Sequence, residues 1–447
     1  MKNILSSSSE YGREAVVLKE INNWNHKIFI RNKKDKYLKM AYSPFIFFRG
    51  TAHLFWSGFS GDWRLNKFGD ADTRTWVQGD NHVENFGAFL NAKKELVYGL
   101  NDFDESVVAD YQHDLWRMAV SIVLVLKQNK NLSKIERENV INTFTKAYLK
   151  TLCSYRDLKD KDLNKIYFTE HNTKGILKKF LKETRKNNSY DKMLKKWLSS
   201  SKKANTFNLN LSKLDYVSQD EYSDIKAAMV SYGRTLTGGI KYNNDFFSLK
   251  DAARRLDAGT GSLGTSRYYI LIEDKTKSVD DDRILDIKHQ GKPTPYYYFN
   301  EAEKINYDRN IENDAQRHAE AYKALSHDAD DFLGWMKLSD GYYSVRERSP
   351  FKETLPSDRL KTEKEFIEMA KQWAIVLATG HEHASRCLYH PLAKNVYALT
   401  KGRNKEFLET VREVAFDYAD QVERDWHYFV DALALTSVDL KRQKGLL

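Results

Sequence analysis

Cysteine, proline and long apolar runs are scarce in this sequence, and each scarcity excludes a class of protein. The two cysteines, Cys153 and Cys387, lie far apart without a C-x-x-C spacing, which argues against a disulfide framework and a structural zinc site. Only 6 prolines and 21 glycines occur in 447 residues, which favours long helices over an all-β fold with many turns. No run of about 18 apolar residues occurs, and residues 1–20 lack a signal-peptide pattern. We therefore expect a cytoplasmic protein with no transmembrane segment.

Positive charge is concentrated in one stretch of the chain. The formal net charge is +10, and residues 173–203 contain eleven Lys or Arg but only two acidic residues. Leu177 and Leu181, and then Leu194 and Trp197, recur at helical spacing, which predicts two short amphipathic helices. A charge run of this kind is usually a solvated face. The alternative is an anionic partner, a nucleic acid or a membrane surface, bound at this segment.

The apolar pattern predicts an α+β fold that is predominantly helical. Helical periodicity covers residues 1–60, 113–128, 134–152, 311–325, 362–386 and 405–433. Alternating or β-branched runs predict strands at residues 74–78, 86–90, 95–100, 252–258, 267–273, 283–289 and 342–347. A polar connection at residues 202–224 marks the main boundary. We expect a helical lobe formed by residues 1–225, including the basic insertion, and by residues 351–447, with a small antiparallel sheet lobe at residues 226–350.

Two polar turns, each closing a predicted strand, carry the strongest chemical signal. The first polar turn is G-D-N-H-V-E-N at residues 79–85, and the second polar turn is N-D-F-D-E at residues 101–105. Phosphoryl transfer from a nucleotide needs a carboxylate that accepts the hydroxyl proton, together with an Asn and a second carboxylate that hold magnesium on the phosphates. Asp80, Asn85 and Asp102 supply all three. Acid-rich turns are also common as caps and Asx-turns, so residue types alone leave both interpretations open.

The order and spacing of these turns resemble the signature of aminoglycoside phosphotransferases and choline kinases, H-G-D-x-H-x-x-N followed by I-D-[FW]-[DE]. The resemblance implies that Asp80 is the catalytic aspartate and that Asn85 binds the metal. It further implies that Asp102 is the counterpart of the aspartate in D-F-G, and it adds Asp104 to the metal ligands. His82 is either a catalytic proton carrier or a structural loop histidine.

Two positions depart from that signature. Gln78 stands where the signature usually has His, and Asn101 replaces the usual apolar residue. Gln78 in place of His changes how the loop is anchored, and it leaves the expected reacting groups in place. Asp114 precedes an apolar helical run, where kinases of this type often begin a helix with D-L-x-R. We interpret Asp114 as a helix cap.

A glycine-rich segment, G-T-G-S-L-G at residues 259–264, is the second chemical signal. In a dinucleotide-binding fold a G-x-G-x-x-G segment is followed by a helix. Here the following residues are β-branched and aromatic and predict a strand, so the arrangement is that of a kinase loop over nucleotide phosphates. We assign nucleotide binding to Gly259, Gly261, Ser262 and Gly264, with an ordinary glycine-rich hairpin as the alternative.

Lys288 strengthens the kinase-like interpretation. It ends the run I-L-D-I-K at residues 284–288, as the lysine of the kinase V-A-I-K strand does, where it pairs with the α- and β-phosphates. The helix predicted after this strand offers Glu312 and Glu320 as ion-pair partners, and the sequence does not choose between them.

The two sets of motifs occur in the reverse of the usual kinase order, which a circular permutation explains. Residues 373–384, W-A-I-V-L-A-T-G-H-E-H-A, resemble the helix that leads directly into the catalytic loop of aminoglycoside kinases. His381 and His383 in this helix point about 200° apart, so they cannot share one metal ion.

As a whole, the chain resembles a bacterial family named domain of unknown function 2252 over residues 40–430. The resemblance rests on both polar turns, the glycine segment, Lys288, S-P-F-I-F-F-R-G at residues 43–50 and Y-A-D-Q-V-E-R-D at residues 418–425. It implies a protein-kinase-like two-lobed fold, and it supplies no established substrate.

These features together predict an ATP- and magnesium-dependent phosphotransferase with a circularly permuted kinase-like fold and an unidentified acceptor. AMP transfer and a non-catalytic nucleotide-binding regulatory protein are the alternatives. A dinuclear phosphoesterase would need further His and Asp ligands, which do not occur at recognisable spacings. A nucleic-acid-binding protein that uses residues 173–203 is the fourth hypothesis.

We predict that the basic segment is dispensable for nucleotide binding, because its charge lies outside every kinase-like motif. Reversal of Lys178, Lys179, Lys195 and Lys196 to Glu should leave the affinity for ATP near its original value. Calorimetric titration measures this, and a large loss of affinity would show that the nucleotide site lies elsewhere.

Overall fold

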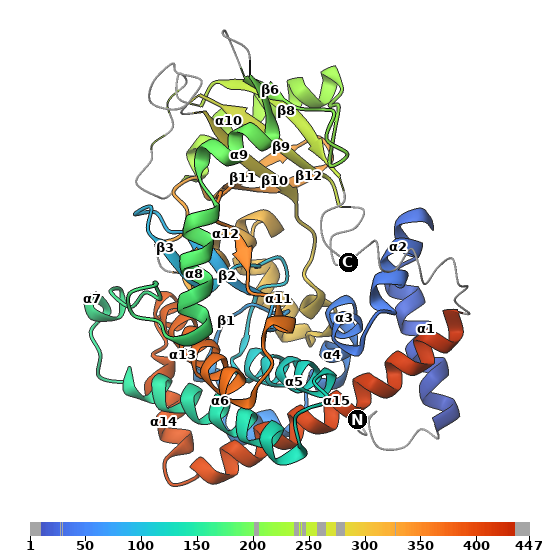
Figure 1. Cartoon of the computed structure of the whole chain (residues 1–447), viewed down its shortest axis with the longest axis vertical. Coiled ribbons are helices and arrows are strands. Elements are labelled where there is room, and N and C mark those ends of the chain that lie inside the picture. The colour runs from blue at the N-terminus through green and yellow to red at the C-terminus, as the bar shows by residue number, and fades with distance from the viewer. Residues whose placement is uncertain are drawn as a thin grey trace.

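Two packed parts form the structure: a large helical part and, at the top of Figure 1, an antiparallel sheet with its own helices. The computed structural model describes residues 10–26, 28, 30–200, 205–236, 241, 243, 247–256, 265–273, 282–326 and 328–433. One large apolar core fills the helical part, and two smaller apolar clusters cover the two faces of the sheet. The predicted α+β class, mainly helical with antiparallel strands, is confirmed.

The helical part is assembled from both ends of the chain and from its middle. Its helices are α1 (Glu10–Trp24), α2 (Ile30–Met40), α3 (Pro44–Gly50), α4 (Ala52–Phe59), α5 (Gln112–Gln128), α6 (Lys134–Ser154), α7 (Asp160–Leu163), α8 (Gly175–Asn187), α11 (Glu301–Asn310), α12 (Asp314–Leu325), α13 (Glu363–Cys387), α14 (Leu392–Thr400) and α15 (Asn404–Leu433). Short 3₁₀ turns occur at η1 (Trp63–Lys67), η2 (Ala71–Thr73), η3 (Thr294–Tyr298) and η4 (Ser357–Arg359). None of the described helices combines the length and apolar character needed to cross a bilayer.

Helix α5 lies at the centre of the helical part. Every side chain from Gln112 to Leu126 is buried, and α3, α6 and α15 pack against this helix. A helix that is apolar on all faces is stable only when neighbours surround it. Because α5 also carries Asp114 and Arg117, these two charged side chains are placed inside the core.

Two strand pairs in the helical part hold the polar turns together. Strand β1 (Arg74–Val77) pairs with β4 (Val107–Asp110), with Val77 opposite Val107. Strand β2 (Phe86–Leu90) pairs with β3 (Leu96–Leu100), with Phe86 opposite Leu100, and β13 (Glu353–Thr354) lies at the other edge of β2. The first polar turn joins β1 to β2 and the second joins β3 to β4, so both ends of each turn are fixed beside the other turn.

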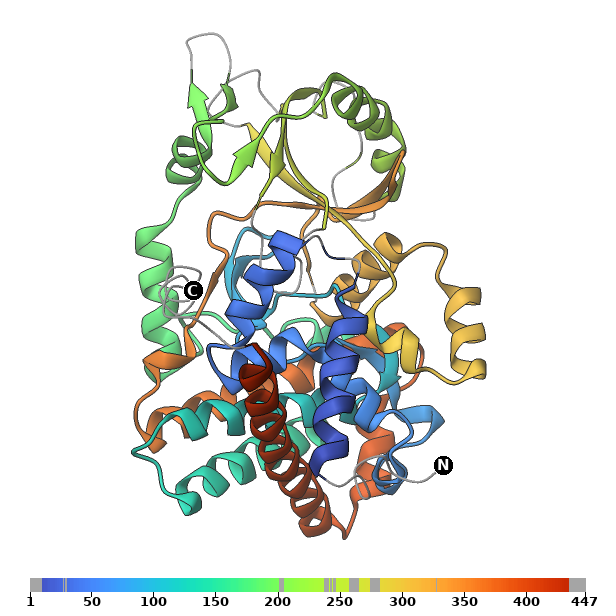
Figure 2. The same cartoon turned by 90° about the vertical axis from the view of Figure 1, so that its right-hand side faces the viewer.

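The larger sheet has six antiparallel strands in the order β11-β12-β10-β9-β8-β7. The strands are β7 (Leu214–Asp215), β8 (Leu249–Arg255), β9 (Arg267–Ile272), β10 (Arg283–His289), β11 (Gly334–Leu338) and β12 (Gly341–Glu347). Helix α10 (Gln219–Thr235) packs on one face, while α9 (Tyr190–Trp197) and the hairpin of β5 (Leu198–Ser200) and β6 (Asn205–Phe207) pack on the other. Figure 2 shows this sheet above the helical part from the side.

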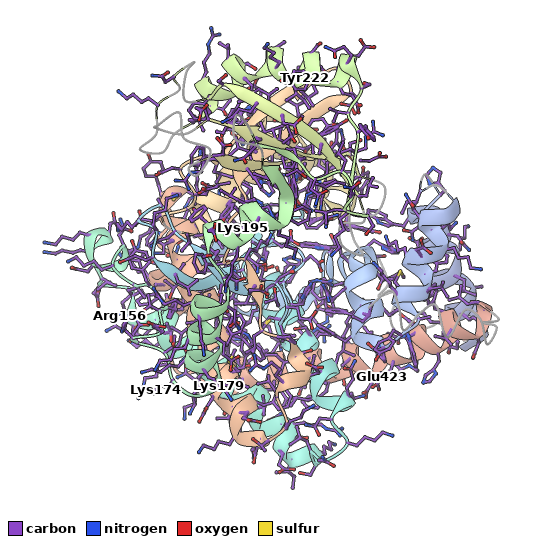
Figure 3. The ribbon with its side chains drawn as sticks, turned by 45° about the horizontal axis from the view of Figure 1, so that its top comes forward. Arg156, Lys174, Lys179, Lys195, Tyr222 and Glu423 are labelled. Atoms are coloured by element: carbon purple, nitrogen blue, oxygen red, sulfur yellow. The ribbon has the colours of Figure 1, made fainter. Side chains whose placement is uncertain are left out.

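The basic segment forms the two predicted amphipathic helices. The apolar side of α8 packs against α13 and β3, and the apolar side of α9 joins the cluster on the sheet. Lys174, Lys179 and Lys195, labelled in Figure 3, are exposed. The segment therefore connects the helical part to the sheet while these three lysines face solvent.

Several elements were not predicted from the sequence, and three of them show why. Helix α10 occupies part of the residues interpreted as a polar connection, although its capping box, Ser218 with Glu221, is a recognisable start signal. Helix α11 buries only Tyr307, so it has no apolar stripe that a periodicity search detects. Strand β11 is short and pairs with β12 through a tight turn.

His53 on α4 is a buried histidine that should weaken the fold in acid. It is 1% exposed, its ring stacks on Trp24 at 4.9 Å between centroids, and neither ring nitrogen has a hydrogen-bond partner among the described residues. Burial, together with the charges of Lys36 and Arg117, lowers its pKa to about 3 from 6.5. Between these pH values the folded state binds fewer protons at His53 than the unfolded state does. This contribution to stability is therefore complete above pH 6.5 and is lost as the pH falls.

We predict that His53→Phe, which retains a stacked ring, reduces the acid sensitivity of the fold. Each pH unit below 6.5 costs the wild type about 1.4 kcal/mol at this residue, so about 2 kcal/mol of unfolding free energy is lost by pH 5. Chemical denaturation at pH 7 and pH 5 measures the difference. An equal loss in wild type and variant would contradict the prediction.

Candidate functional site

A polar cleft between the sheet and the helical part contains the described residues of the predicted site. It has a volume of about 330 Å³ and is lined by Arg49, Gln78, Asp80, His82, Asn85, Asp102, Asp104, Glu105, Thr265, Lys288, His289, Gln290, Gly291 and Lys292. A larger cavity of about 760 Å³ lies between α11, α12 and the end of α13, but none of the predicted site residues lines it. The polar cleft is therefore the candidate functional site.

Asp80 is held by a buried arginine. The Nε and Nη2 atoms of Arg117 donate to Asp80 Oδ1, the first at 2.8 Å. The guanidinium of Arg117 packs over the rings of Phe48 and Phe55, at 4.1 and 5.1 Å from their centroids. Burial raises the pKa of Asp80 to about 6, although the charge of Arg117 acts in the opposite direction. The Oδ2 atom has no hydrogen-bond partner among the described residues, so it remains available to a proton or ligand.

Asp114 fixes the backbone of the first polar turn. Its two carboxylate oxygens accept hydrogen bonds from the backbone N–H groups of Gln78, at 2.6 Å, and Gly79, at 3.0 Å. His381 Nε2 lies 3.3 Å from the same carboxylate, and His381 Nδ1 lies 2.7 Å from the hydroxyl of Tyr148. The helix-cap interpretation of Asp114 is wrong, because α5 begins before this residue and the carboxylate binds the turn instead.

The second polar turn is held through its carbonyl groups. Arg317, a fully buried residue of α12, donates to the carbonyl oxygens of Asp104, at 2.7 Å, Ser106, at 2.8 Å, and Phe103, at 3.4 Å. These bonds fix the backbone, and the side chains of Asp102, Asp104 and Glu105 line the cleft. The carboxylate of Asp102 is exposed there and has no hydrogen-bond or ion-pair partner among the described residues.

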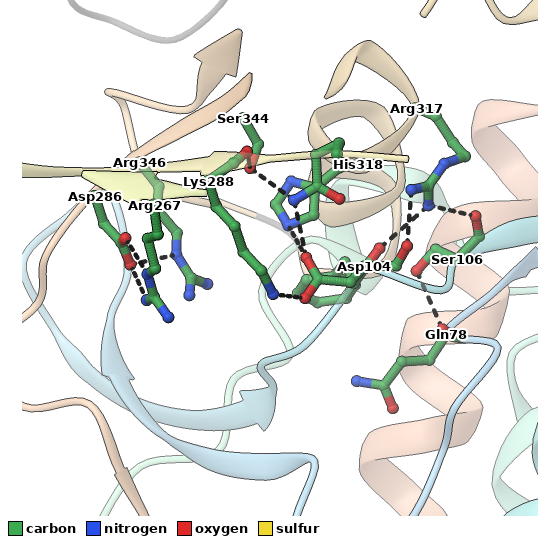
Figure 4. Close-up of polar contacts among 12 residues, drawn as sticks. Gln78, Asp104, Ser106, Arg267, Asp286, Lys288, Arg317, His318, Ser344 and Arg346 are labelled. Carbon is green, nitrogen blue, oxygen red and sulfur yellow. Dashed lines mark hydrogen bonds and ion pairs between the residues drawn. The ribbon is translucent and has the colours of Figure 1, made fainter. Parts of the chain in front are cut away.

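Lys288 connects the sheet to the second polar turn. Its ammonium forms an ion pair with Asp104, and Gln290 Nε2 donates to the same carboxylate at 2.9 Å (Figure 4). His318 Nε2 lies 3.7 Å from Asp104. Burial alone would raise the pKa of Asp104, but the charge of Lys288 outweighs it and holds that pKa well below its ordinary value. A lysine and a carboxylate that are 184 residues apart in the chain thus meet in one cleft.

The predicted ion pair of Lys288 with Glu312 or Glu320 is wrong. The backbone N–H of Glu312 donates to the side chain of Gln316, and Glu320 accepts from Gln316 Nε2 at 2.8 Å and lines the larger cavity. Helix α12 is rotated so that Arg317 and His318 face the second polar turn, while Glu320 faces away. Asp104 therefore takes the place expected for a glutamate.

His82 is bonded to the backbone of the first polar turn. It is buried, and its Nδ1 accepts a hydrogen bond from the backbone N–H of Glu84 at 3.2 Å. Burial and the nearby charges of Arg49 and Arg117 hold its pKa well below the ordinary value, so the ring is neutral at neutral pH. A neutral ring whose Nδ1 accepts a backbone hydrogen bond favours the loop-histidine interpretation over the proton carrier.

The donor atoms in the cleft fit magnesium that is shared with phosphate groups. Asn85 Nδ2 donates to the carbonyl oxygen of Asp80 at 2.8 Å, which leaves the amide oxygen of Asn85 for a cation. In the described part of the chain, no three His, Cys, Asp or Glu side chains converge as a metal site. Magnesium usually takes only one or two carboxylates when it also binds phosphates and water. Asn85 and Asp102 meet this requirement, whereas Asp104 is engaged with Lys288.

The glycine segment lies outside the described residues, including Gly259, Gly261, Ser262 and Gly264. The strands on either side of it, β8 and β9, are antiparallel neighbours in the sheet. Thr265, directly after the segment, lines the polar cleft. The assignment of these four residues to nucleotide binding remains a prediction.

Three residues of the site were not found from the sequence. Arg117 follows Asp114 by three positions, which places both on one side of α5, so the D-L-x-R pattern was a usable signal. Gln290 follows Lys288 by two positions and shares its side of the chain, which alternation along a strand predicts. Arg317 gave no signal, because a buried arginine that binds carbonyl groups is not distinguishable by pattern from an exposed one.

The comparisons with known proteins place the chain in one family. Residues 32–432 match the family described as "Uncharacterized protein conserved in bacteria (DUF2252)". No curated protein and no solved structure matches the chain. The description of the family names no reaction, so the functional argument depends on the cleft itself.

We predict that Gly79→Ala destabilises the protein more than Gly61→Ala. Both glycines have a positive φ, +82° and +74°, but a Cβ atom at Gly79 would lie 2.0 Å from the carbonyl oxygen of Glu105, whereas at Gly61 nothing lies within 4 Å. The backbone conformation alone costs an alanine about 1 kcal/mol. Urea denaturation should therefore show about this loss for Gly61→Ala and a larger one for Gly79→Ala. Equal losses of unfolding free energy in the two variants would mean that the first polar turn can accommodate the added Cβ atom without a loss of stability.

Proposed function

Because the chain belongs to the family DUF2252 of uncharacterized bacterial proteins, we propose its function from the cleft: it is an ATP- and magnesium-dependent phosphotransferase. The observation that carries the proposal is the contact of Lys288 with Asp104, which lies two residues after Asp102 and in the same cleft as Asp80 and Asn85. A phosphate-pairing lysine, a base and oxygen donors for a cation are the parts that transfer from a nucleotide requires.

The residues of the cleft have separate roles in the proposed reaction. Asp80 accepts the proton of the acceptor hydroxyl on its free Oδ2, while Arg117 holds Oδ1 and orients the carboxylate. The acceptor oxygen forms a bond to the γ-phosphorus, and the bond from that phosphorus to the bridging oxygen breaks, so that ADP leaves with the electron pair. A base with a pKa of about 6 is mostly ionised at neutral pH, which suits this role.

Lys288, Asn85 and Asp102 bind and orient the donor. The ammonium of Lys288 lines the cleft beside Asp104, where it can pair with phosphate oxygens. Asn85 and Asp102 would hold magnesium, which neutralises the developing charge on the phosphates when it is bound. Arg49 and Lys292 also line the cleft, where Arg49 pairs with Glu84 and Lys292 pairs with Asp308.

Strand order supports a kinase-like fold. In the large sheet, the strand before the glycine segment, the strand after it and the lysine strand are consecutive neighbours, β8-β9-β10. A helix, α12, follows the lysine strand, and the hairpin β11-β12 then returns to pair with it. This is the order in which a kinase sheet lobe is built around its glycine loop, lysine and first helix.

The position of α13 supports the circular permutation. Helix α13 packs beside β1, and Thr75 on β1 donates from its Oγ1 to the carbonyl oxygen of His381 at 3.1 Å. In an unpermuted chain this helix would lead directly into the first polar turn. Here the turn comes about 300 residues earlier in the sequence, and tertiary packing restores the arrangement.

We predict that ATP with magnesium binds the protein and that Lys288→Ala and Asp102→Ala each weaken the binding at least tenfold. Loss of one charge-assisted contact to phosphate or cation is worth about 1.5–3 kcal/mol. Isothermal titration calorimetry measures the affinity, and ligand-induced thermal stabilisation gives a second readout. Lys337→Ala, at an exposed position of the same sheet, is the control and should bind as wild type does.

Asp80→Asn separates binding from catalysis in the same experiment. It should retain ATP affinity within a fewfold and lower transfer to the acceptor by about 10²–10⁴-fold. Labelled ATP incubated with a metabolite extract, followed by mass analysis, supplies the acceptor. Undiminished ATP affinity in both Lys288→Ala and Asp102→Ala would rule out this cleft as the nucleotide site.

A further inference from the structure

Four charged side chains share the cleft-facing side of the sheet next to the proposed phosphate site. Asp286 lies two residues before Lys288 on β10, so both side chains point to the same face. The strand register places Arg267 of β9 opposite Lys288, and Arg346 of β12 opposite Asp286. Figure 4 shows these side chains together below the sheet.

On this face of the sheet, Arg267, Lys288 and Arg346 outnumber the one carboxylate, Asp286. The adjoining small cavity is lined by three acidic residues, Asp286, Asp330 and Glu347, and by three basic residues, Arg346, Arg348 and Lys352. Arg267 pairs with Asp286 through two hydrogen bonds, one of them from Nε at 2.7 Å. Arg346 Nε lies 3.7 Å from the same carboxylate, and no hydrogen bond of the Arg346 guanidinium occurs among the described residues. Burial alone would raise the pKa of Asp286, but Arg267 and Arg346 hold it well below the ordinary value. Arg346 is 19% exposed and lines a small cavity beside the polar cleft.

The place where a kinase would hold a purine ring is therefore polar. In the V-A-I-K strand the alanine precedes the lysine by two positions, and Asp286 takes that position here. Asn101, which replaces an apolar residue of the kinase signature, lines the same small cavity as Asp286, Arg346 and Lys352. This cavity has a volume of about 30 Å³, far below that of a pocket that encloses a nucleotide base. A flat aromatic base needs an apolar slot, which these residues do not supply.

We propose that the small cavity beside the polar cleft, lined by Arg346, Asp286 and Lys352 and adjoined by Arg267, is an anion subsite that binds a phosphate group in place of a purine. The inference deepens the proposed function and rests on it. Two sources supply such a phosphate. It is either the terminal phosphate of a nucleotide bound in the inverted direction, or a phosphate carried by the acceptor substrate.

The inverted direction changes the reaction. The acceptor oxygen then forms a bond to the α-phosphorus, and the bond from the α-phosphorus to the oxygen bridging to the β-phosphorus breaks. Pyrophosphate leaves with the electron pair, and the acceptor proton passes to Asp80. The product carries AMP, whereas a phosphorylated acceptor at the subsite leaves γ-phosphoryl transfer unchanged.

Calorimetric titration of the full chain with inorganic tripolyphosphate and magnesium tests the subsite. Arg346→Gln should weaken binding about tenfold, because it removes a charge-assisted contact. Asp286→Asn should strengthen tripolyphosphate binding, because it removes the opposing charge. A variant that had only lost structure would bind more weakly. Arg254→Gln is the matched control, since Arg254 lies on the opposite face of the sheet and pairs with Glu221.

Arg346→Lys keeps the charge and covers the case in which Arg346→Gln fails to fold. Arg346→Lys should retain most of the affinity, and circular dichroism checks each variant. Absence of tripolyphosphate binding to the wild type, or equal affinity in wild type, Arg346→Gln and Asp286→Asn, overturns the subsite. If ATP with magnesium still binds in that case, only this inference fails. If ATP does not bind at all, the proposed function fails.

Competition and labelling distinguish the two sources of phosphate. Tripolyphosphate that displaces ATP, together with label transferred from the α-position of ATP, assigns the subsite to the donor. Tripolyphosphate that binds together with ATP, and label transferred from the γ-position, assigns it to the acceptor. Either result supports an anion subsite if the binding of tripolyphosphate is weakened in Arg346→Gln.

Discussion

Two backbone N–H groups at the start of the first polar turn donate to the buried carboxylate of Asp114, and the geometry of the cleft depends on these bonds. The carboxylate belongs to α5, contacts His381 of α13, and through it Tyr148 of α6. A buried charge is tolerated only when it is fully hydrogen-bonded. Three helices and the turn therefore take up one arrangement, and the same packing buries Arg117, which orients Asp80.

Local pattern was sufficient for short apolar runs bounded by polar turns. The predicted strands at residues 86–90 and 283–289 coincide with β2 and β10, because polar residues mark both ends of each run. The described residues assigned to the site also lie in one cleft, since strand ends with fixed register leave little freedom in placing a turn. The resemblance to the kinase signature implied a role for each of these residues, and the structure gives the distances between their side chains.

Side-chain pairing between distant segments could not be predicted from the sequence. Glu320 and His318 are two residues apart on α12, and only the rotation of that helix in the packed core decides which of them faces Lys288. The binding of Arg317 to three carbonyl groups likewise depends on where α12 meets the second polar turn. Helix α11 escaped detection because it contributes little to the core and so needs no apolar stripe.

The order of segments along the chain affects how the protein matures during synthesis. The large sheet is built from one continuous stretch, so its contacts can form as soon as that stretch has left the ribosome. The helical part cannot close in this way, because α5 and the first polar turn are made early while α13 and α15, which cover them, are made last. Until then the carboxylate of Asp114 lacks His381, and the apolar surface of α5 stays uncovered. The half of the molecule that carries both polar turns is thus the later one to become native, and the cleft is complete only when α13 and α15 have docked.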